Sequence, residues 1–133
     1  MLRMIDWEPL LKAAREARDN AHAPYSGYRV GAALLDDHGR VFAGCNVENR
    51  TFGLTICAER TAMVSAVAAG STRFTALAVV TASSPPAAPC GQCRDSLAEF
   101  GIDLPVLMAN TDGERREMSL AELLPEPFSL PPR

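Results

Sequence analysis

Long apolar runs are missing from this sequence, and so is any excess of basic residues. No apolar run approaches the roughly 18 residues that a membrane-spanning helix needs. The stretch MLRMIDWEPL has no signal-peptide core, so we expect a cytoplasmic protein with no membrane partner. The 13 Lys and Arg residues are outnumbered by 16 Asp and Glu residues, which gives a net charge of −3. Because no basic cluster offsets this charge, a nucleic acid polymer is disfavoured as a partner.

Cysteine is scarce, with four residues in a chain of 133. In a reducing compartment these thiols are metal ligands, catalytic groups or small buried hydrophobes rather than disulfides. The length predicts a single domain over residues 1–133, which is large enough to bury a core without disulfides. Hydrophobic residues (47%) and charged residues (22%) occur at the levels of an ordinary folded domain, so disordered and collagen-like chains are excluded. The four cysteines are Cys45, Cys57, Cys90 and Cys93.

Apolar spacing and turn residues predict alternating helices and strands. We expect helices over residues 7–21, 58–69 and 92–100, with Asp6 as the first N-cap and a capping box at 119–122 opening a short last helix. We expect strands over residues 30–35, 41–47, 76–81, 106–109 and 115–118, and an irregular tail over 125–133. Hairpin turns join the first two and the last two strands, whereas a helix makes the third and fourth parallel. The fold class is therefore α/β, a three-layer α/β/α arrangement with a mixed five-stranded sheet.

Two short segments carry residues suited to metal chemistry, and each precedes or opens a predicted helix. They are Cys57-Ala58-Glu59 and Pro89-Cys90-Gly91-Gln92-Cys93. Cys90 and Cys93 alone fit a redox couple or half of a zinc site, and Cys57 supplies a third sulfur. Helix dipoles favour thiolates at helix starts, and Arg60 offsets the charge of −1 that three thiolates leave on Zn²⁺.

Glu59 distinguishes a catalytic zinc site from a structural one. Zinc with three protein ligands keeps a fourth position for water and produces hydroxide near neutral pH. A carboxylate beside that water collects and delivers protons, which is the arrangement of zinc deaminases. Two other interpretations stay open: a closed zinc module with Cys45 as the fourth ligand, and a thiol oxidoreductase built on Cys90 and Cys93. We favour a buried core position for Cys45.

With these segments in place, the sequence resembles the small homotetrameric cytidine deaminases. The resemblance runs from Ala23 to Phe128, and Asn46-Val47-Glu48-Asn49 narrows it to the free-nucleoside branch. Further matching segments are Ala23-Pro24-Tyr25-Ser26, Val30-Gly31-Ala32-Ala33-Leu34, Cys57-Ala58-Glu59-Arg60-Thr61-Ala62, Pro89-Cys90-Gly91-Gln92-Cys93-Arg94 and Leu123-Leu124-Pro125.

The resemblance implies one zinc ion per subunit on Cys57, Cys90 and Cys93, with Glu59 as proton shuttle. The reaction it implies is hydrolytic deamination of cytidine and deoxycytidine to uridine and deoxyuridine plus ammonia, in pyrimidine salvage. Zinc hydroxide attacks C4 of cytosine, and Glu59 protonates N3 and then the departing amine. Because Glu59 must titrate near neutrality, we expect its pocket to be largely apolar and closed.

The resemblance also implies a set of substrate-binding residues. Asn46 and Glu48 bind the ribose hydroxyls, and Glu48 repels a phosphate, which favours nucleosides over nucleotides. The backbone of Ala58 contacts the pyrimidine, and Tyr28 stands where the family usually carries Phe against the base. Phe128 matches an aromatic residue that reaches into a neighbouring subunit's active site, although packing on its own core is an equal alternative.

Two positions depart from the family pattern. Phe52 replaces a usual Tyr and so lacks a hydroxyl, and Asp95 replaces a common Gln after Cys-Arg.

A deaminase of another cytosine nucleoside, such as a nucleoside antibiotic, is the alternative function with the same chemistry.

Overall fold

A mixed sheet of five strands organises the computed structural model, which describes residues 4–131. The strand order is β2-β1-β3-β4-β5, with β3 and β4 parallel and the other neighbours antiparallel. This arrangement confirms the predicted mixed sheet. The strands are β1 (Gly31–Asp36), β2 (Val41–Cys45), β3 (Phe74–Thr81), β4 (Pro105–Asn110) and β5 (Arg115–Ser119).

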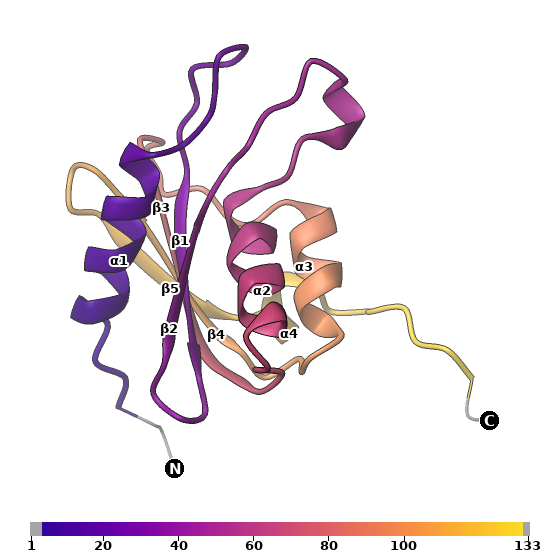
Figure 1. Ribbon diagram of the computed structural model, residues 1–133. Helices are drawn as coiled ribbons and strands as arrows, with labels where there is room; N and C mark the ends of the chain where they lie inside the picture. Colours follow the sequence, from indigo (N-terminus) through magenta and orange to yellow (C-terminus); the bar gives the residue numbers. More distant parts are fainter. Residues whose placement is uncertain (1–3, 132–133) are drawn as a thin grey trace.

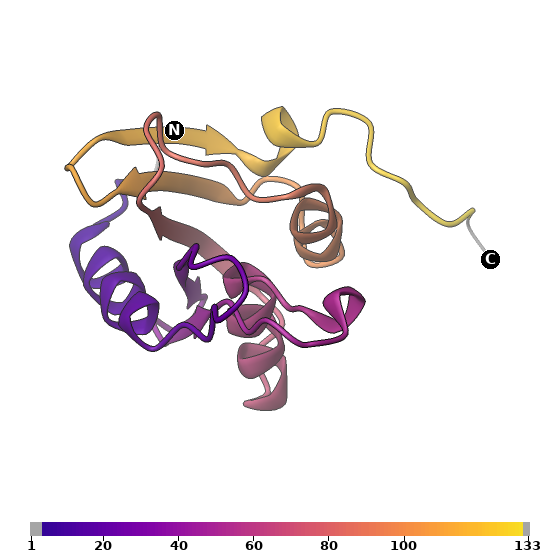
Figure 2. The same ribbon diagram turned by 90° about the horizontal axis from the view of Figure 1, so that it is seen from above.

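Helices cover both faces of the sheet and give the predicted three layers (Figures 1 and 2). One face carries α1 (Glu8–Asp19), and the other carries α2 (Ala58–Ala68), α3 (Gly91–Ala98) and the short α4 (Leu120–Leu123). Each face has its own apolar cluster, so alternate residues of the central strand β3 point into different layers. Within residues 4–131, no helix has both the length and the apolar character to cross a bilayer.

The helix α1 buries the apolar side expected from its spacing, but it begins without the predicted cap. Leu10, Leu11 and Ala14 are buried against the sheet. The N-cap is Trp7 rather than Asp6, and no side chain caps the helix; the Asp6 carboxylate accepts only a long bond of 3.3 Å from the Glu8 amide. The prediction of Asp6 as the N-cap was wrong because α1 begins at Glu8, which leaves Asp6 one residue before the N-cap position.

Small residues bring α2 close to the sheet. Its buried positions next to the sheet include Ala58, Ala62 and Ala66, and β2 presents Gly44 to them. A Cβ atom at Gly44 would lie 2.4 Å from the Ala62 amide nitrogen, so only glycine fits at this approach. The start of α2 is therefore held at a fixed distance from β2.

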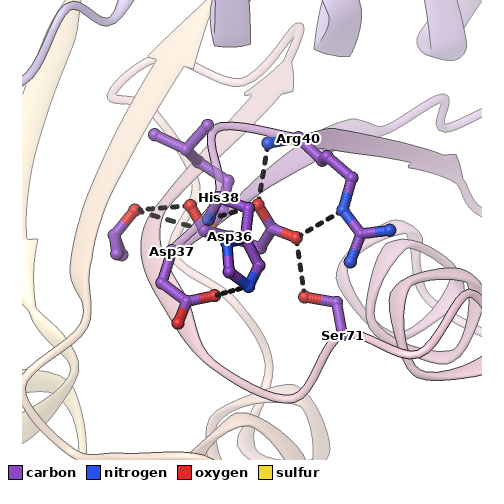
Figure 3. Close-up of polar contacts among 7 residues, drawn as sticks. Asp36, Asp37, His38, Arg40 and Ser71 are labelled. Atoms are coloured by element: carbon purple, nitrogen blue, oxygen red, sulfur yellow. Dashed lines mark hydrogen bonds and ion pairs between the residues drawn. The ribbon is translucent and has the colours of Figure 1, made fainter.

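The turn between β1 and β2 is held by a buried carboxylate (Figure 3). Asp36 is 2% exposed and accepts bonds from the amides of His38 and Arg40, the Arg40 Nε and the Ser71 hydroxyl. Burial opposes ionisation, but these hydrogen bonds outweigh it and lower the pKa of Asp36 to about 2. The network closes the end of the sheet where the hairpin turns.

Element ends differ from the predictions by one or two residues in most cases, and two features differ in kind. The second strand ends at Cys45, and Val47 forms separate bridges with His22 and Ile56. A short 3-10 helix, η1 (Phe52–Leu54), was not predicted. Residues 125–131 form no helix or strand, as expected for the tail. Residues 1–3 and 132–133, which belong to the predicted domain and tail, lie outside the described residues.

Candidate metal centre

Two loops that feed helices bring three of the four cysteines together. Cys57 is the N-cap of α2, Cys90 is the N-cap of α3, and Cys93 lies in the first turn of α3. The sulfur of Cys90 is 3.6 Å from that of Cys57 and 3.5 Å from that of Cys93. All three sulfurs lie within 4.8 Å of one another, so they are positioned to bind a single metal ion.

The sulfur geometry fits zinc. Thiolates bind Zn²⁺ at about 2.3 Å in a tetrahedral arrangement, which separates neighbouring sulfurs by about 3.8 Å. The separations of 3.5 and 3.6 Å between the cysteine sulfurs need only a small expansion to reach that value. Cys45 is not part of the cluster; it lies at the end of β2 and lines a surface hollow with Ala13 and Thr61. The fourth sulfur required by a closed zinc module is therefore not at the cluster.

Positive charge surrounds the cluster. The Arg60 Nη2 lies 3.8 Å from the Cys57 sulfur and 3.4 Å from the Thr55 carbonyl oxygen, while Arg60 Nε is buried without a partner in residues 4–131. The hydrogen bond from Cys93 and the Arg60 guanidinium lower the pKa of Cys57 to about 5 although burial acts in the other direction. Both helix N-termini add partial positive charge at the same point. The thiolate form of Cys57 is therefore favoured, whereas the hydrogen bond to Cys57, together with burial, raises the pKa of the Cys93 thiol.

Glu59 lies in the first turn of α2, next to the cysteine cluster, and is 4% exposed. Burial raises the pKa of its carboxyl to about 7, and the negative charge of Cys57 acts in the same direction. A carboxyl with this pKa is present in both protonated and ionised forms at neutral pH. It can therefore accept and release protons under physiological conditions.

A cavity of about 200 Å³ adjoins the cysteines and Glu59. Larger hollows of about 480 Å³ and 460 Å³ lie elsewhere, but their linings contain no cysteine. The sequence predicted six of the lining residues, and it missed the others because they are small or apolar and carry no motif. The lining consists of Tyr28, Val30, Asn46, Thr55, Cys57, Ala58, Glu59, Val79, Thr81, Ala87, Ala88 and Cys90.

Asn46 and Glu48 both hold the loop that precedes β1. The Asn46 amide donates to the Tyr28 carbonyl oxygen at 2.8 Å and accepts from the Val30 amide at 2.9 Å. The Glu48 carboxylate accepts from the amides of Tyr25 and Ser26 and from the Ser26 hydroxyl. These bonds, the one from the Ser26 hydroxyl above all, lower the pKa of Glu48. Asn46 lines the cavity, whereas Glu48 lies beyond its described lining.

Other candidate residues lie away from the cavity. Phe128 is 76% exposed on a tail that runs away from the body of the protein (Figure 2), and it is not among the described lining residues. Phe52 is 72% exposed and contacts the Tyr25 ring edge-on at 5.4 Å between centroids. Asp95 is exposed on α3. The structure offers no physical account of the two departures at Phe52 and Asp95.

Comparisons with known proteins agree with this geometry. Residues 4–109 match the family model described as the cytidine and deoxycytidylate deaminase zinc-binding region. The cytidine deaminase of Sporosarcina psychrophila is 45% identical over 126 residues, which cover 94% of this chain and 93% of that protein.

Solved structures give the same result. A cytidine deaminase from Burkholderia pseudomallei superimposes with a TM-score of 0.90 at 48% identity and covers 93% of this chain and 100% of its own. The Mycobacterium tuberculosis cytidine deaminase gives a TM-score of 0.83 at 41% identity and covers 96% of this chain and 100% of its own. This chain is an enzyme of the zinc-binding cytidine deaminase family.

Proposed function

We propose that this enzyme hydrolyses cytidine and deoxycytidine to uridine and deoxyuridine with release of ammonia, in pyrimidine salvage. The observation that carries the proposal is a buried Glu59 beside a cluster of three cysteines, at a cavity that Glu59, Cys57 and Cys90 line. Relatives named cytidine deaminase, which align over nearly the whole chain, support the substrate class.

Cys57, Cys90 and Cys93 hold one zinc ion in this proposal, and Arg60 offsets part of their negative charge. Zinc supplies a Lewis acid that lowers the pKa of a bound water to about 7. Three protein ligands would leave a bound zinc ion able to take up water, and Cys57 and Cys90 line the cavity that a substrate would enter.

Glu59 moves the protons of the reaction. Its carboxylate accepts the proton that water loses, then delivers it to N3 of cytosine as the new C4–O bond forms. Glu59 next carries the second proton of water to the exocyclic amine, the C4–N bond breaks, and ammonia leaves. A pKa near 7 suits a group that must accept and release protons in each cycle. The lining around these steps is mostly apolar, with alanine and valine side chains.

The substrate occupies the cavity with its base inward. We assign the Tyr28 ring and the Ala58 backbone to the base, and Asn46 and Glu48 to the ribose hydroxyls. The Asn46 amide makes one donated and one accepted bond to the loop, which leaves one N–H and one lone pair for a sugar. An ionised Glu48 near the sugar repels a phosphate, so we propose nucleosides as substrates rather than nucleotides.

We further propose a cytoplasmic homotetramer of single-domain chains, residues 1–133, with active sites at subunit interfaces. Large apolar side chains that one chain leaves in solvent support the association: Phe52, Leu54, Phe128 and Leu130 are each at least 67% exposed. Phe128 then reaches a neighbouring subunit's site. Light scattering of the purified protein should give about 57 kDa, four times the 14.3 kDa of one chain. A mass of one chain would contradict the tetramer.

The reaction is tested with the zinc-loaded enzyme and cytidine, followed by the loss of substrate absorbance and by zinc analysis. Glu59→Gln should abolish deamination and keep about one zinc per chain, because the amide cannot move a proton and the cysteines are unchanged. Glu99→Gln, an exposed glutamate at the end of α3, should behave as wild type. A wild-type protein that holds zinc and leaves cytidine, deoxycytidine and related cytosine nucleosides unchanged would refute the proposal.

The sugar site is tested separately with Glu48→Ala. This change should raise the KM for cytidine far more than it weakens binding of free cytosine, because cytosine has no hydroxyls for Glu48 to bind. Equal effects on the two compounds would remove Glu48 from the sugar site and leave it as an anchor of the Tyr25–Ser26 loop.

A further inference from the structure

Two walls of the cavity come from distant parts of the chain and are joined by one pair of side-chain hydroxyls. Tyr28 belongs to the loop before β1, whereas Ala87, Ala88 and Cys90 belong to the loop between β3 and α3. Between these segments the Tyr28 phenol and the Ser83 hydroxyl form a hydrogen bond, in which either group can donate. The bond therefore ties the loop before β1 to the loop that follows β3.

The Tyr28 end of this bond is anchored through the backbone. The Tyr28 carbonyl oxygen accepts from the Asn46 amide at 2.8 Å, and its amide donates to the Ser26 hydroxyl at 2.9 Å. The ring itself is less restrained, because Tyr28 is 41% exposed. Packing alone does not fix its two side-chain torsions, so the hydroxyl contact decides where the ring lies.

The Ser83 end is anchored to the sheet. Its amide donates to the Thr81 hydroxyl at 3.1 Å, and its carbonyl oxygen accepts from the Asn110 side chain at 3.0 Å. Thr81 and Asn110 are neighbours in the parallel register of β3 and β4, and both are 2% exposed. The Asn110 side chain also donates to the Glu114 carboxylate. The Ser83 hydroxyl is thus presented from a rigid, buried base.

We propose that the Tyr28–Ser83 hydroxyl pair is a clasp that sets the position of the aromatic wall of the pocket, which makes Tyr28 and Ser83 positioning residues for substrate binding. The proposal rests on the proposed function insofar as the Tyr28 ring faces the base. The clasp acts before the chemical step, since neither hydroxyl is part of the cysteine cluster or of Glu59. Its loss affects KM rather than kcat, because a loosely held ring must be ordered each time the substrate binds.

The clasp is tested by a double-mutant cycle on the zinc-loaded enzyme with cytidine. Tyr28→Phe and Ser83→Ala should each raise KM about three- to ten-fold, as expected for the loss of one exposed hydrogen bond, and change kcat less than about two-fold. The double variant should be no worse than either single variant, because both remove the same bond. Ser83→Thr keeps a hydroxyl and should retain the wild-type KM.

Tyr25 provides a matched control. It is the other of the two tyrosines in the chain, it lies three residues away in the same loop, and its ring contacts Phe52. Tyr25→Phe should leave KM unchanged. Effects of Tyr28→Phe and Ser83→Ala that multiply in the double variant, or no change of KM in either, would overturn the clasp.

A second measurement is independent of turnover. Hydrogen–deuterium exchange at the amides of residues 25–30 should be several-fold faster in Tyr28→Phe and in Ser83→Ala than in wild type and Tyr25→Phe. Unchanged exchange in both variants would overturn the clasp even if KM changed. A wild type that does not turn over cytidine would refute the proposed function instead, and exchange alone would then decide whether the clasp holds the loop.

Discussion

Replacing Gly44 by alanine should damage both stability and the active site, because α2 rests directly on this residue. The new Cβ would lie 2.4 Å from the Ala62 nitrogen and 2.6 Å from the Ala58 carbonyl oxygen, whereas ordinary contact begins at 3.4 Å. Both neighbours are backbone atoms of α2, so no side chain can turn aside. The start of the helix must move by about 1 Å, and this start carries Cys57 and Glu59.

The expected magnitude follows from that displacement. Overpacking of this kind costs about 1–3 kcal/mol, which should lower the urea midpoint of the zinc-loaded protein by about 1 M. A misplacement of about 1 Å in a catalytic group costs about 100-fold in rate, so kcat/KM for cytidine should fall by about that factor. Activity is measured well below the unfolding midpoint of the variant, so that the loss is not a loss of folded protein.

Two other glycines serve as controls for Gly44→Ala. Gly53→Ala should behave as wild type, since no atom beyond its own chain neighbours lies within 4 Å of its added Cβ. Gly31→Ala places its Cβ 1.8 Å from the Ala14 carbonyl oxygen of α1, on the opposite face of the sheet, and should lose stability with a smaller loss of kcat/KM. Wild-type stability and activity in Gly44→Ala would refute the reasoning, as would an equal loss of kcat/KM in folded Gly31→Ala.

Three further changes test other contacts. The pKa of Asp36 is about 2 in the folded protein against an ordinary 3.8, so the stability that its carboxylate adds is present above about pH 4 and is lost as pH falls through 2. The urea midpoint of the metal-free protein should therefore fall more steeply with acid in wild type than in Asp36→Asn. Parallel curves for the two proteins would contradict this. Ser119→Ala removes the capping box of α4 and should cost about 1 kcal/mol, measured as a thermal midpoint lower by about 3–5 °C. Arg60→Gln should weaken zinc binding about ten-fold in a chelator competition, because Cys57 loses its nearby cation; the same result in the exposed Arg50→Gln would show that net charge alone is responsible.

Local patterns made most of the elements predictable. The hairpin at Asp36 through Gly39, the alanine-rich α2 and the apolar β3 each follow from residues close in sequence, and the structure confirms them. The cysteines at 57, 90 and 93 were predictable as a cluster because each precedes or opens a helix, and helix starts attract thiolates. The position of Glu59 beside the cysteine cluster was predictable because it lies two residues after Cys57 in the sequence.

Contacts between distant segments were not predictable in the same way. Ala87 and Ala88 line the cavity only because the loop before α3 folds back over the end of β3, and alanine carries no signal for this role. The placement of Ser83 depends on the register that sets Thr81 beside Asn110, which is a long-range property of the sheet. The bonds from Asn46 to the backbone at positions 28 and 30 also require the folded loop.

The cysteines sit on two separate helices, so a bound ion would tie α2 to α3 across 33 residues of chain. A covalent link that closes a loop of this length restricts the unfolded chain by about 3–4 kcal/mol, and a metal bridge acts in the same sense. Occupancy of the metal site would then govern the stability of the folded chain as well as its catalytic activity. The zinc-free chain would then unfold more readily than the zinc-loaded chain and would be more exposed to proteolysis.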